Sequence, residues 1–253
     1  MKGIVLAGGR ATRLRPLTLV TSKQLLPVYD KPMVYYPIET LVKAGIKDIL
    51  IIIAPDYSGH FLNLLGTGEQ FGAHFSYAVQ SEPRGLADAF VVGADFIDGD
   101  NVTMMLGDNI TDKDFTKEIN SFKKGGMVFA KKVPDPERYG VVTFDENHNV
   151  LTIEEKPKNP KSNYAIFGLY TFDHRVVDFA KHLTPSARNE IEIVDLHNIY
   201  RDLGELKVNT LDDDTLWEDA GTFESLLRVS NIMAQRAATC VKENSPVVLN
   251  KKV

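Results

Sequence analysis

Four short apolar runs dominate the first hundred residues, and amphipathic stretches separate them. The runs predict strands at residues 3–6, 48–54, 75–79 and 102–106. Residues 33–44, 57–65 and 86–96 carry apolar side chains at helical spacing, and Gly45 can cap the first of these helices. Strands that are apolar on both faces and alternate with helices are typical of a parallel sheet covered by helices. Ligands of such sheets bind at the carboxyl ends of the strands.

The pattern changes after residue 108. Residues 127–133, 139–145, 150–155 and 164–172 predict four strands joined by short turns, and helical spacing returns at 175–182, 193–203 and 222–238. We therefore expect an α/β fold of the Rossmann-like, doubly wound kind. Its sheet is mostly parallel and carries a mixed or antiparallel extension.

Composition excludes several classes of protein. The net charge of −5 argues against a nucleic-acid binder, which needs excess basic surface. No apolar run approaches the roughly 20 residues that span a bilayer, so no membrane partner is expected. The single cysteine, Cys240, excludes an internal disulfide, and the six histidines have no metal-ligand spacing. Because Met1 leads directly into a strand without a secretory leader, we expect a cytoplasmic protein.

A glycine-rich turn follows the first strand. Gly8 and Gly9 let backbone N–H groups approach an anion closely, and Arg13 and Lys23 add positive charge nearby. The turn matches neither the Walker A spacing nor G-x-G-x-x-G, so the usual ATPase and dinucleotide interpretations fail. It predicts a phosphate-binding loop of another kind. An ordinary strand-to-helix turn is the alternative.

Several motifs in order along the chain resemble those of the sugar-phosphate nucleotidyltransferases. Residues 23–33 are similar to the glucose-1-phosphate thymidylyltransferase branch in particular, in a short form without the C-terminal extension of longer members. The matching motifs are Leu6-Ala7-Gly8-Gly9, Thr12-Arg13-Leu14, Lys23-Gln24-Leu25-Leu26-Pro27, Gln80-Ser81-Glu82-Pro83-Arg84-Gly85-Leu86-Ala87, Gly107-Asp108-Asn109, Tyr139-Gly140-Val141-Val142, Glu154-Glu155-Lys156-Pro157 and Trp217-Glu218-Asp219-Ala220-Gly221-Thr222.

The resemblance implies a reaction and a domain organisation. The phosphate of glucose 1-phosphate attacks the α-phosphorus of dTTP, which gives dTDP-glucose and pyrophosphate. The nucleophile is already an anion at neutral pH, so cations matter more than a general base. One domain is implied over residues 1–240, with a nucleotide-binding part at about 1–110, a sugar-binding part at about 111–222 and a C-terminal helix at 222–240. Residues 241–253 are expected to form a tail.

The resemblance also assigns nucleotide-binding residues. It places the glycine loop on the triphosphate, Arg13 on the leaving pyrophosphate and Lys23 on the phosphates. Gln80 would recognise thymine or uracil, because its amide offers both a donor and an acceptor; an exposed Gln at a strand end is the alternative. The family usually has a third glycine where this chain has Ala11. Because alanine, unlike glycine, rarely adopts a positive φ, we expect Ala11 to have a negative φ. The implied set is Gly8, Gly9, Ala11, Thr12, Arg13, Lys23, Gln24, Gln80, Gly85 and Asp108. Arg10 and Arg15 are expected to be solvated.

Two distant carboxylates are implied as ligands of Mg²⁺. Asp108 follows the strand at 102–106, and Asp219 follows an apolar run that contains Trp217. Mg²⁺ is a hard cation that bridges one or two carboxylates to phosphate oxygens. Alone, each Asp would read as a turn or N-cap residue. Trp217 is interpreted as a packing residue.

The remaining implied residues bind the sugar phosphate. Glu155 would accept hydrogen bonds from sugar hydroxyls and Lys156 would hold the phosphate, although a surface ion pair is the alternative. Phe167 stands where this branch often has a small polar residue, which affects one side of the sugar. The implied set is Asn109, Gly140, Glu155, Lys156 and Ile166, and the implied catalytic residues are Arg13, Lys23, Asp108 and Lys156.

Alternatives to this function share parts of the same evidence. The same scaffold could use UTP or another sugar 1-phosphate, because no single side chain here decides how the 2′-hydroxyl is treated. A non-catalytic nucleotide-sugar sensor should lack a metal carboxylate or the phosphate lysine. A glycosyltransferase should pair its carboxylates on one loop. We also expect a homo-oligomer, either a dimer or a tetramer.

Overall fold

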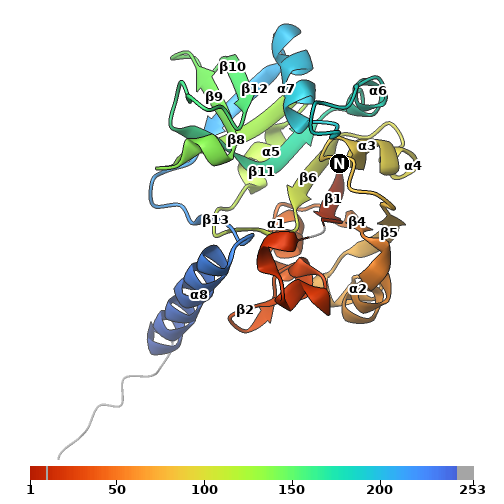
Figure 1. Cartoon of the computed structure of the whole chain (residues 1–253), viewed down its shortest axis with the longest axis vertical. Helices are drawn as coiled ribbons and strands as arrows, with labels where there is room; N and C mark the ends of the chain where they lie inside the picture. The colour runs from red at the N-terminus through yellow and green to blue at the C-terminus, as the bar shows by residue number, and fades with distance from the viewer. Residues whose placement is uncertain (10, 244–253) are drawn as a thin grey trace, which may run out of the picture.

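The computed structural model describes residues 1–9 and 11–243 of the chain (Figure 1). Arg10, residues 244–253 and the side chains of residues 240–243, including Cys240, lie outside what is described. A sheet of nine strands forms the centre. These strands are β1 (Lys2–Ala7), β4 (Asp48–Ile53), β5 (His74–Val79), β6 (Val102–Leu106), β8 (Gly126–Lys132), β9 (Gly140–Phe144), β10 (Val150–Glu155), β11 (Tyr164–Phe172) and β12 (Leu206–Thr210).

Half of this sheet is parallel, as the apolar runs predicted. β1 lies between β4 and β6, and β5 pairs with the outer side of β4; all three pairings are parallel. Successive side chains of β1 pack into apolar clusters on opposite faces of the sheet, because side chains alternate along a strand. Ile4 and Leu6 belong to one apolar cluster, whereas Val5 and Ala7 belong to another. The inner strands β1, β4 and β6 are therefore buried on both faces, whereas the outer strand β5 is partly exposed.

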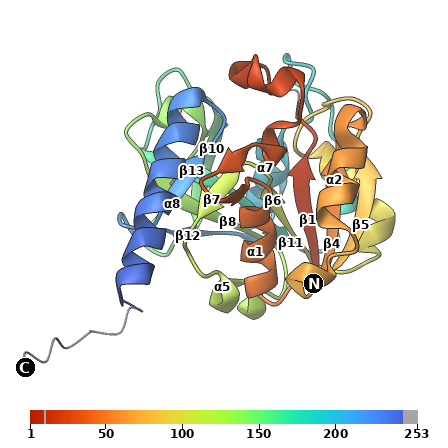
Figure 2. The same ribbon diagram turned by 90° about the horizontal axis from the view of Figure 1, so that it is seen from below.

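Helices cover the two faces. α1 (Tyr35–Lys43), α2 (Ser58–Leu65) and α5 (Thr116–Ser121) contribute to the cluster that contains Val5. α3 (Asp88–Val92), α4 (Ala94–Ile97), α6 (Val176–Lys181) and α7 (Ile193–Asp202) contribute to the cluster that contains Ile4. Figure 2 is viewed from the side that α1 and α2 cover. The arrangement is a doubly wound α/β fold.

The long strand β11 joins the parallel half to the extension. Its last residues, from Leu169, pair antiparallel with β6, whereas Ala165 pairs with β9. β8 lies along its other edge, and the register shifts between Ile166 and Tyr170. The sheet therefore divides at this shift, and β9, β10, β8 and β12 form the mixed extension that was expected.

Two small sheets and a long helix complete the fold. β7 (Asn109–Thr111) pairs antiparallel with β13 (Trp217–Asp219), and β2 (Pro27–Val28) pairs with β3 (Lys31–Pro32). α8 (Phe223–Glu243) follows β13 and extends from the body of the molecule in Figure 1. Its apolar side packs on β2 and β13 through a third cluster that includes Val28, Ile110 and Val229. The helix runs three residues past its expected end at 240.

The structure also differs from the sequence prediction in places. The helix expected at 86–96 is divided into α3 and α4 at Gly93, where a Cβ would lie 3.2 Å from both Ile4 and Leu50. Gly93 therefore lets this segment approach the sheet closely. The sequence did not predict β7, β12, β13 or α5. Among the helices of residues 1–9 and 11–243, none has the length and hydrophobicity needed to cross a bilayer.

Candidate functional site

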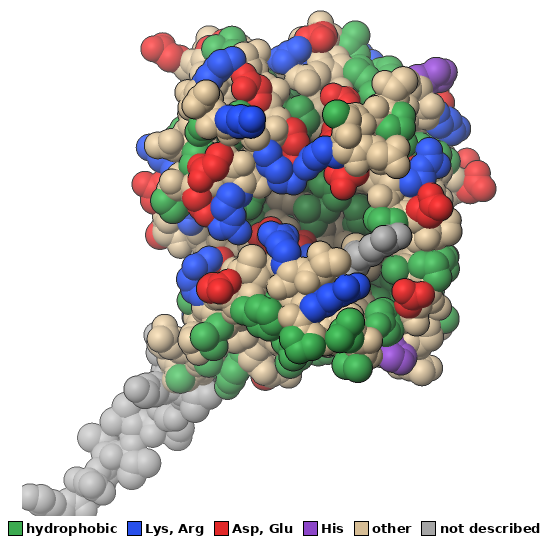
Figure 3. Space-filling view, in the orientation of Figure 1, with side chains coloured by type: hydrophobic (Ala, Val, Ile, Leu, Met, Phe, Trp, Pro, Cys, Tyr) green, Lys and Arg blue, Asp and Glu red, His purple; other side chains and the backbone are tan. Residues whose placement is uncertain are grey.

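Two adjoining cavities open where the central strands end. The large cavity has a volume of about 550 Å³, and the small cavity has a volume of about 230 Å³. Leu86 and Leu106 line both cavities and so form their common wall. In Figure 3 this face of the molecule is hollowed near its middle, with Lys and Arg side chains at the rim and hydrophobic side chains inside. The position agrees with the expected carboxyl ends of the strands.

The small cavity collects most of the residues implied for the nucleotide. Gly8 and Gly9 follow β1, Gln80 follows β5, and Asp108 follows β6. Lys23, Gln24 and Gly85 complete this part of its lining. Ala11 lies in a neighbouring depression that Gly9, Arg15 and Lys23 also line. Thr12 is exposed and is not among the residues that line the small cavity.

Gln80 and Gln24 are buried at the bottom of the small cavity. Gln80 is 6 % exposed and Gln24 is 3 % exposed, so the alternative of an exposed Gln80 at a strand end is wrong. Nε2 of Gln80 donates to Asp88, and the Ser22 hydroxyl donates to Oε1 of Gln24 over 2.7 Å. Both amides are therefore held by neighbours beneath the cavity.

Gly85 is required by the path of a second chain segment. Its φ is +109°, and a Cβ there would lie 2.3 Å from the Ile191 carbonyl oxygen. The two segments are joined by backbone hydrogen bonds, from Ile191 N to Arg84 O and from Ala87 N to Ile191 O. Only glycine fits at this crossing. Residues 84–87 beside the small cavity are thus fastened to the segment that leads into α7.

The loop at Ala11 differs from our expectation. Ala11 has φ +46° and ψ +42°, so it adopts the left-handed conformation and the expected negative φ is wrong. Its carbonyl oxygen accepts hydrogen bonds from the Thr18 hydroxyl at 2.8 Å and from Leu14 N at 3.2 Å. These two contacts hold a conformation that alanine adopts at a cost of roughly 1–2 kcal/mol.

Ala11→Gly should therefore keep the loop and its function. Glycine adopts the left-handed conformation without this cost, which offsets the greater freedom it gives the unfolded chain. Because these two contributions to stability nearly cancel and the loop keeps its conformation, we expect the nucleotide KM to change by less than about threefold. Steady-state kinetics measures this. A large loss of activity would mean that the methyl group itself supports the loop.

Asp108 and Asp219 meet at the junction of the two cavities. Asp108 lines the small cavity and Asp219 lines the large one. The pairing of β7 with β13 places Asp219 opposite Asn109, and Ala220 N donates to the Asp108 carbonyl oxygen over 3.0 Å. Residues more than a hundred positions apart are thereby brought side by side. The antiparallel β7–β13 pair, which the sequence did not predict, makes this possible.

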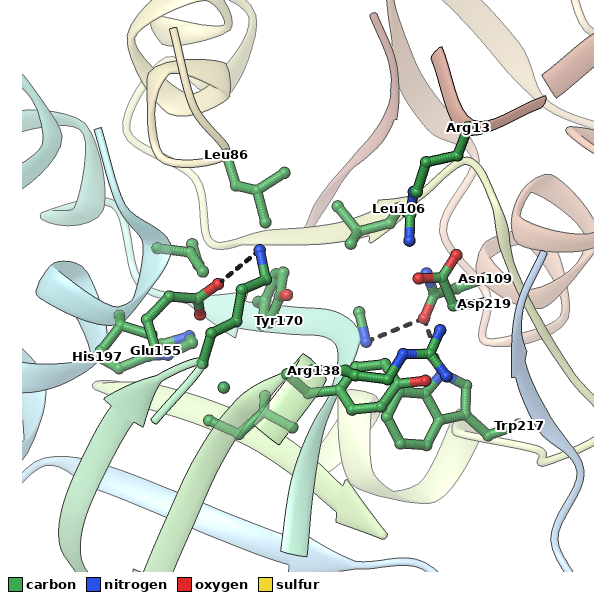
Figure 4. A pocket seen from close by; sticks show the side chains of 17 residues that line it. Arg13, Leu86, Leu106, Asn109, Arg138, Glu155, Tyr170, His197, Trp217 and Asp219 are labelled. Atoms are coloured by element: carbon green, nitrogen blue, oxygen red, sulfur yellow. Dashed lines mark hydrogen bonds and ion pairs between the residues drawn. The ribbon is translucent and has the colours of Figure 1, made fainter. Parts of the chain in front are cut away.

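The two carboxylates differ in the number of partners that they contact. Asp108 forms an ion pair with Lys23 and accepts from Nδ2 of Asn109 at 3.1 Å. Oδ1 of Asp219 is buried and has no partner among the described residues. A Cβ at Gly221 would lie 2.7 Å from this oxygen and from the Arg13 guanidinium, so Gly221 leaves room for both groups. Figure 4 shows Arg13 reaching toward Asp219.

The pKa values of the two carboxyl groups are driven apart. Burial alone would raise the pKa of Asp108, but the charge and hydrogen bond of Lys23 together with Asn109 hold it below the usual range. Burial and the neighbouring Asp108 charge raise the pKa of Asp219 to about 6, against smaller opposing effects of Lys23 and Arg13. An ionised Asp219 is therefore costly without a further cation.

These carboxylates fit a divalent metal that keeps some of its waters. The unpartnered oxygen of Asp219 is a free ligand, and Asp108 offers a second carboxylate beside it. Within the described residues, no three His, Cys, Asp or Glu side chains gather as a metal site. Mg²⁺ typically binds proteins through one or two carboxylates plus phosphate oxygens, so a pair suffices.

Asp219→Asn should stabilise the metal-free protein at high pH only. The folded pKa of Asp219, about 6, lies above its ordinary value of 3.8. Folding is therefore opposed by ionisation of Asp219, an effect that begins as pH rises through about 4 and is complete above about 6. A neutral amide removes it. Thermal unfolding should show a higher Tm than wild type at pH 8 and no such gain at pH 4; a gain at both would contradict the assigned cause.

The large cavity holds the residues implied for the sugar phosphate. Glu155, at the end of β10, and Lys156 line it together with Gly140 and Ile166. Lys156 Nζ lies 3.2 Å from Oε1 of Glu155, so the alternative ion pair exists, within the cavity lining. Figure 4 shows Glu155 across the cavity from Asp219. The hydroxyl-accepting and phosphate-holding roles remain predictions.

Asn109 lies at the wall of the same cavity but is engaged by the protein. It is 3 % exposed. Its Oδ1 accepts from Trp217 Nε1 at 2.8 Å and from Gly168 N at 3.2 Å, and its Nδ2 donates to Asp108. A Cβ at Gly168 would lie 2.7 Å from this oxygen, so glycine permits the contact. The geometry thus favours Asn109 as a support for Asp108.

Sequence reasoning missed part of the large cavity. Trp217 lines it rather than only packing, and its ring lies 5.3 Å from that of Tyr139. Phe167 is not in the lining; it is fully buried behind Trp217 at 5.4 Å, so it does not limit the sugar side. Other unpredicted residues near or in the lining are Arg138, Val194, His197 and Arg188, the last at 3.4 Å from Glu155. Their positions depend on tertiary contacts, and only Tyr139 and Trp217 stood in recognised motifs.

Comparison with known proteins gives consistent matches. The family model for nucleotidyl transferases matches residues 2–236. A glucose-1-phosphate thymidylyltransferase of Neisseria meningitidis is 54 % identical over 230 residues, covering 89 % of this chain and 80 % of the relative. The enzyme of that name from Mycolicibacterium smegmatis is 51 % identical over 236 residues, covering 92 % of this chain and 82 % of the relative.

Solved structures share the architecture. A Bacillus anthracis structure described as a glucose-1-phosphate thymidylyltransferase with sucrose has a TM-score of 0.86 at 42 % identity, covering 92 % of this chain and 94 % of that one. A UDP-glucose pyrophosphorylase structure with UDP-glucose has a TM-score of 0.81 at 22 % identity, covering 93 % and 98 %. At that identity the second likeness concerns the fold alone.

Proposed function

Because this chain belongs to the nucleotidyl transferase family, we propose that it transfers a thymidylyl group from dTTP to glucose 1-phosphate. The products are dTDP-glucose and pyrophosphate. Two relatives that are 54 % and 51 % identical to this chain over most of its length are named for this activity. A nucleoside triphosphate and a sugar 1-phosphate are thus the two substrates.

One observation carries the proposal. Two cavities share a wall, and one carboxylate from each meets at their junction. A transferase that joins two phosphorylated substrates needs two such pockets with the reacting phosphates between them. We place the nucleotide in the small cavity, with its base at Gln80, and the sugar in the large cavity at Glu155. The α-phosphorus then lies near Asp108 and Asp219.

The residues of the chain would orient and neutralise the reactants. Lys23 and Arg13 are placed on the triphosphate and Lys156 on the sugar phosphate, so the repulsion between two anions is reduced as they approach. No proton needs to leave the nucleophile, because the sugar phosphate is already an anion at neutral pH. Asp108 and Asp219 would hold the Mg²⁺, which supplies Lewis-acid activation of the α-phosphorus when bound.

Alternatives from the sequence are separated by these positions. The cavities are lined by both carboxylates and by all three cationic side chains that the reaction needs, Arg13, Lys23 and Lys156. A non-catalytic sensor should lack one of these groups, so this alternative is disfavoured. The carboxylates come from distant segments rather than one loop, which disfavours a glycosyltransferase. Use of UTP or another sugar 1-phosphate is compatible with the same geometry.

A substrate panel tests the proposal. The protein is incubated with dTTP, UTP or CTP and several sugar 1-phosphates in the presence of Mg²⁺, and pyrophosphate and the nucleotide-sugar are quantified. We expect dTTP with glucose 1-phosphate to give the highest kcat/KM. A clear preference for UTP would assign the alternative activity, and release of nucleoside diphosphate instead of pyrophosphate would reject the family reaction.

The assembly and location of the protein stay predictions. We expect a homo-oligomer, a dimer or a tetramer, which light scattering of the purified protein measures directly. The exposed apolar side chains of Phe223 and Leu227 on α8, at 44 % and 64 % exposure, support this expectation. The cytoplasmic location is tested by fractionation of cells that express the chain.

A further inference from the structure

Gln80 and Asp88 form a buried hydrogen-bonded pair beneath the small cavity. Nε2 of Gln80 donates to Oδ2 of Asp88 over 2.7 Å, and Asp88 is only 3 % exposed. Asp88 is the first residue of α3 and lies one residue beyond the motif at 80–87. Its other carboxylate oxygen lies 3.9 Å from Arg84. The pair is therefore a built feature of the cavity floor.

The carboxylate decides which way the Gln80 amide faces. An amide can turn by half a rotation and exchange its donor for its acceptor, but a carboxylate oxygen only accepts hydrogen bonds. Asp88 therefore holds the nitrogen of Gln80 toward itself. The oxygen points the other way, since a Cβ at Gly8 in the cavity wall would lie 3.1 Å from Oε1 of Gln80.

We propose that Asp88 is a positioning residue for base recognition, which fixes Gln80 so that its oxygen accepts the N3–H of thymine or uracil. This inference rests on the proposed function, which places the base in the small cavity. Cytosine carries an acceptor at N3, so it would set two acceptors against each other. Asp88 thereby excludes cytidine nucleotides, and it does not separate dTTP from UTP, whose bases share N3–H.

Gln24 supplies the complementary half of the pattern. The Ser22 hydroxyl donates to its Oε1 over 2.7 Å, which leaves the Nε2 group as the donor available to the cavity. The cavity then presents an acceptor from Gln80 and a donor from Gln24. Thymine and uracil offer an N3–H between two carbonyl oxygens, so the acceptor of Gln80 and the donor of Gln24 match their edge.

Asp88→Asn tests the proposal with a nearly isosteric change. Asparagine can donate as well as accept, so the Gln80 amide is no longer held one way. We expect the KM for dTTP to rise with kcat nearly unchanged, and the ratio of kcat/KM for dTTP over dCTP to fall by about tenfold or more. Asp95→Asn, on the exposed side of α4, is the matched control and should keep the wild-type ratio. A folded Asp88→Asn variant with the wild-type ratio would overturn the inference.

Two further measurements separate this role from a structural one. In a Gln80→Ala background, Asp88→Asn should no longer change the dTTP/dCTP ratio, whereas a structural role would lower activity in both backgrounds. If Asp88→Asn does not fold, Asp88→Ser offers a smaller hydroxyl that also donates, with the same expected loss of discrimination.

Equilibrium binding keeps the inference apart from the proposed function. Calorimetry with dTTP and dCTP measures discrimination without turnover. Preferential dTTP binding that Asp88→Asn removes, in a protein that makes no dTDP-glucose, would support the role of Asp88 and reject the proposed reaction. Equal binding of dTTP and dCTP by the wild type would overturn the inference about Asp88.

Discussion

We expect Asp219→Asn to lower kcat by at least about 100-fold while the protein stays folded. The change removes the charge of a buried oxygen that has no partner among the described residues and that faces the junction of the two cavities. A neutral amide oxygen binds a hard cation much more weakly than a carboxylate does. Pyrophosphate release measures kcat, and calorimetry with Mn²⁺ in the presence of nucleotide should show weaker metal binding.

The control for this variant is Asp213→Asn. Asp213 lies in an exposed turn four residues before Trp217 and touches neither cavity lining, so both activity and metal affinity should match the wild type. Retention of full pyrophosphate release by Asp219→Asn would show that the metal is held elsewhere. Loss of activity with unchanged Mn²⁺ affinity would assign Asp219 a role other than metal binding.

Gly85→Ala should impair nucleotide and sugar sites together. The backbone at φ +109° costs alanine about 1–3 kcal/mol, and its Cβ would overlap the Ile191 carbonyl oxygen, which is backbone and cannot rotate away. Either residues 84–87 or the segment at Ile191 must shift. Because a displacement of about 1 Å can cost about 100-fold in rate, we expect kcat/KM to fall by tenfold to 100-fold, on the order of that effect.

Gly59→Ala is the matched control for this substitution. Gly59 lies in α2, its φ is not positive, and an added Cβ would meet nothing within 4 Å. Alanine is favoured over glycine in a helix by up to about 1 kcal/mol, so stability should be equal or higher and activity unchanged. Kinetics for both substrates and thermal unfolding measure the two variants side by side. Normal KM values for Gly85→Ala would mean that the two segments can separate without effect.

The fold of the parallel half could be predicted because its inner strands β1, β4 and β6 are apolar on both faces. β6, β10 and β11 have the bounds that the sequence indicated. β12 and β13 were missed because each is short and partly polar; the alternation of apolar and polar residues in β12 covers too few residues to distinguish it from a loop. The helix expected at 86–96 is broken at Gly93 because of the close approach to the sheet, which is a tertiary effect.

The candidate site, like the fold, could be predicted only in part. Motif resemblance brought together the glycine loop, Lys23 and the two carboxylates, and the structure places these groups around adjoining cavities. Local reasoning failed at Ala11, because hydrogen bonds to its carbonyl oxygen hold a conformation that alanine alone avoids. The role proposed for Asp88 could not be predicted from the sequence, since it depends on a buried contact with Gln80.

A crystal structure with dTDP-glucose and Mn²⁺ would show whether the metal lies between the two substrate cavities. We expect an anomalous peak at about 2.2 Å from carboxylate oxygens of both Asp108 and Asp219, since Mn²⁺ takes oxygen ligands much as Mg²⁺ does. The base should contact Gln80 in the small cavity and the glucose should contact Glu155 in the large one. A metal away from either carboxylate, or a sugar bound outside the large cavity, would contradict this assignment of the two cavities.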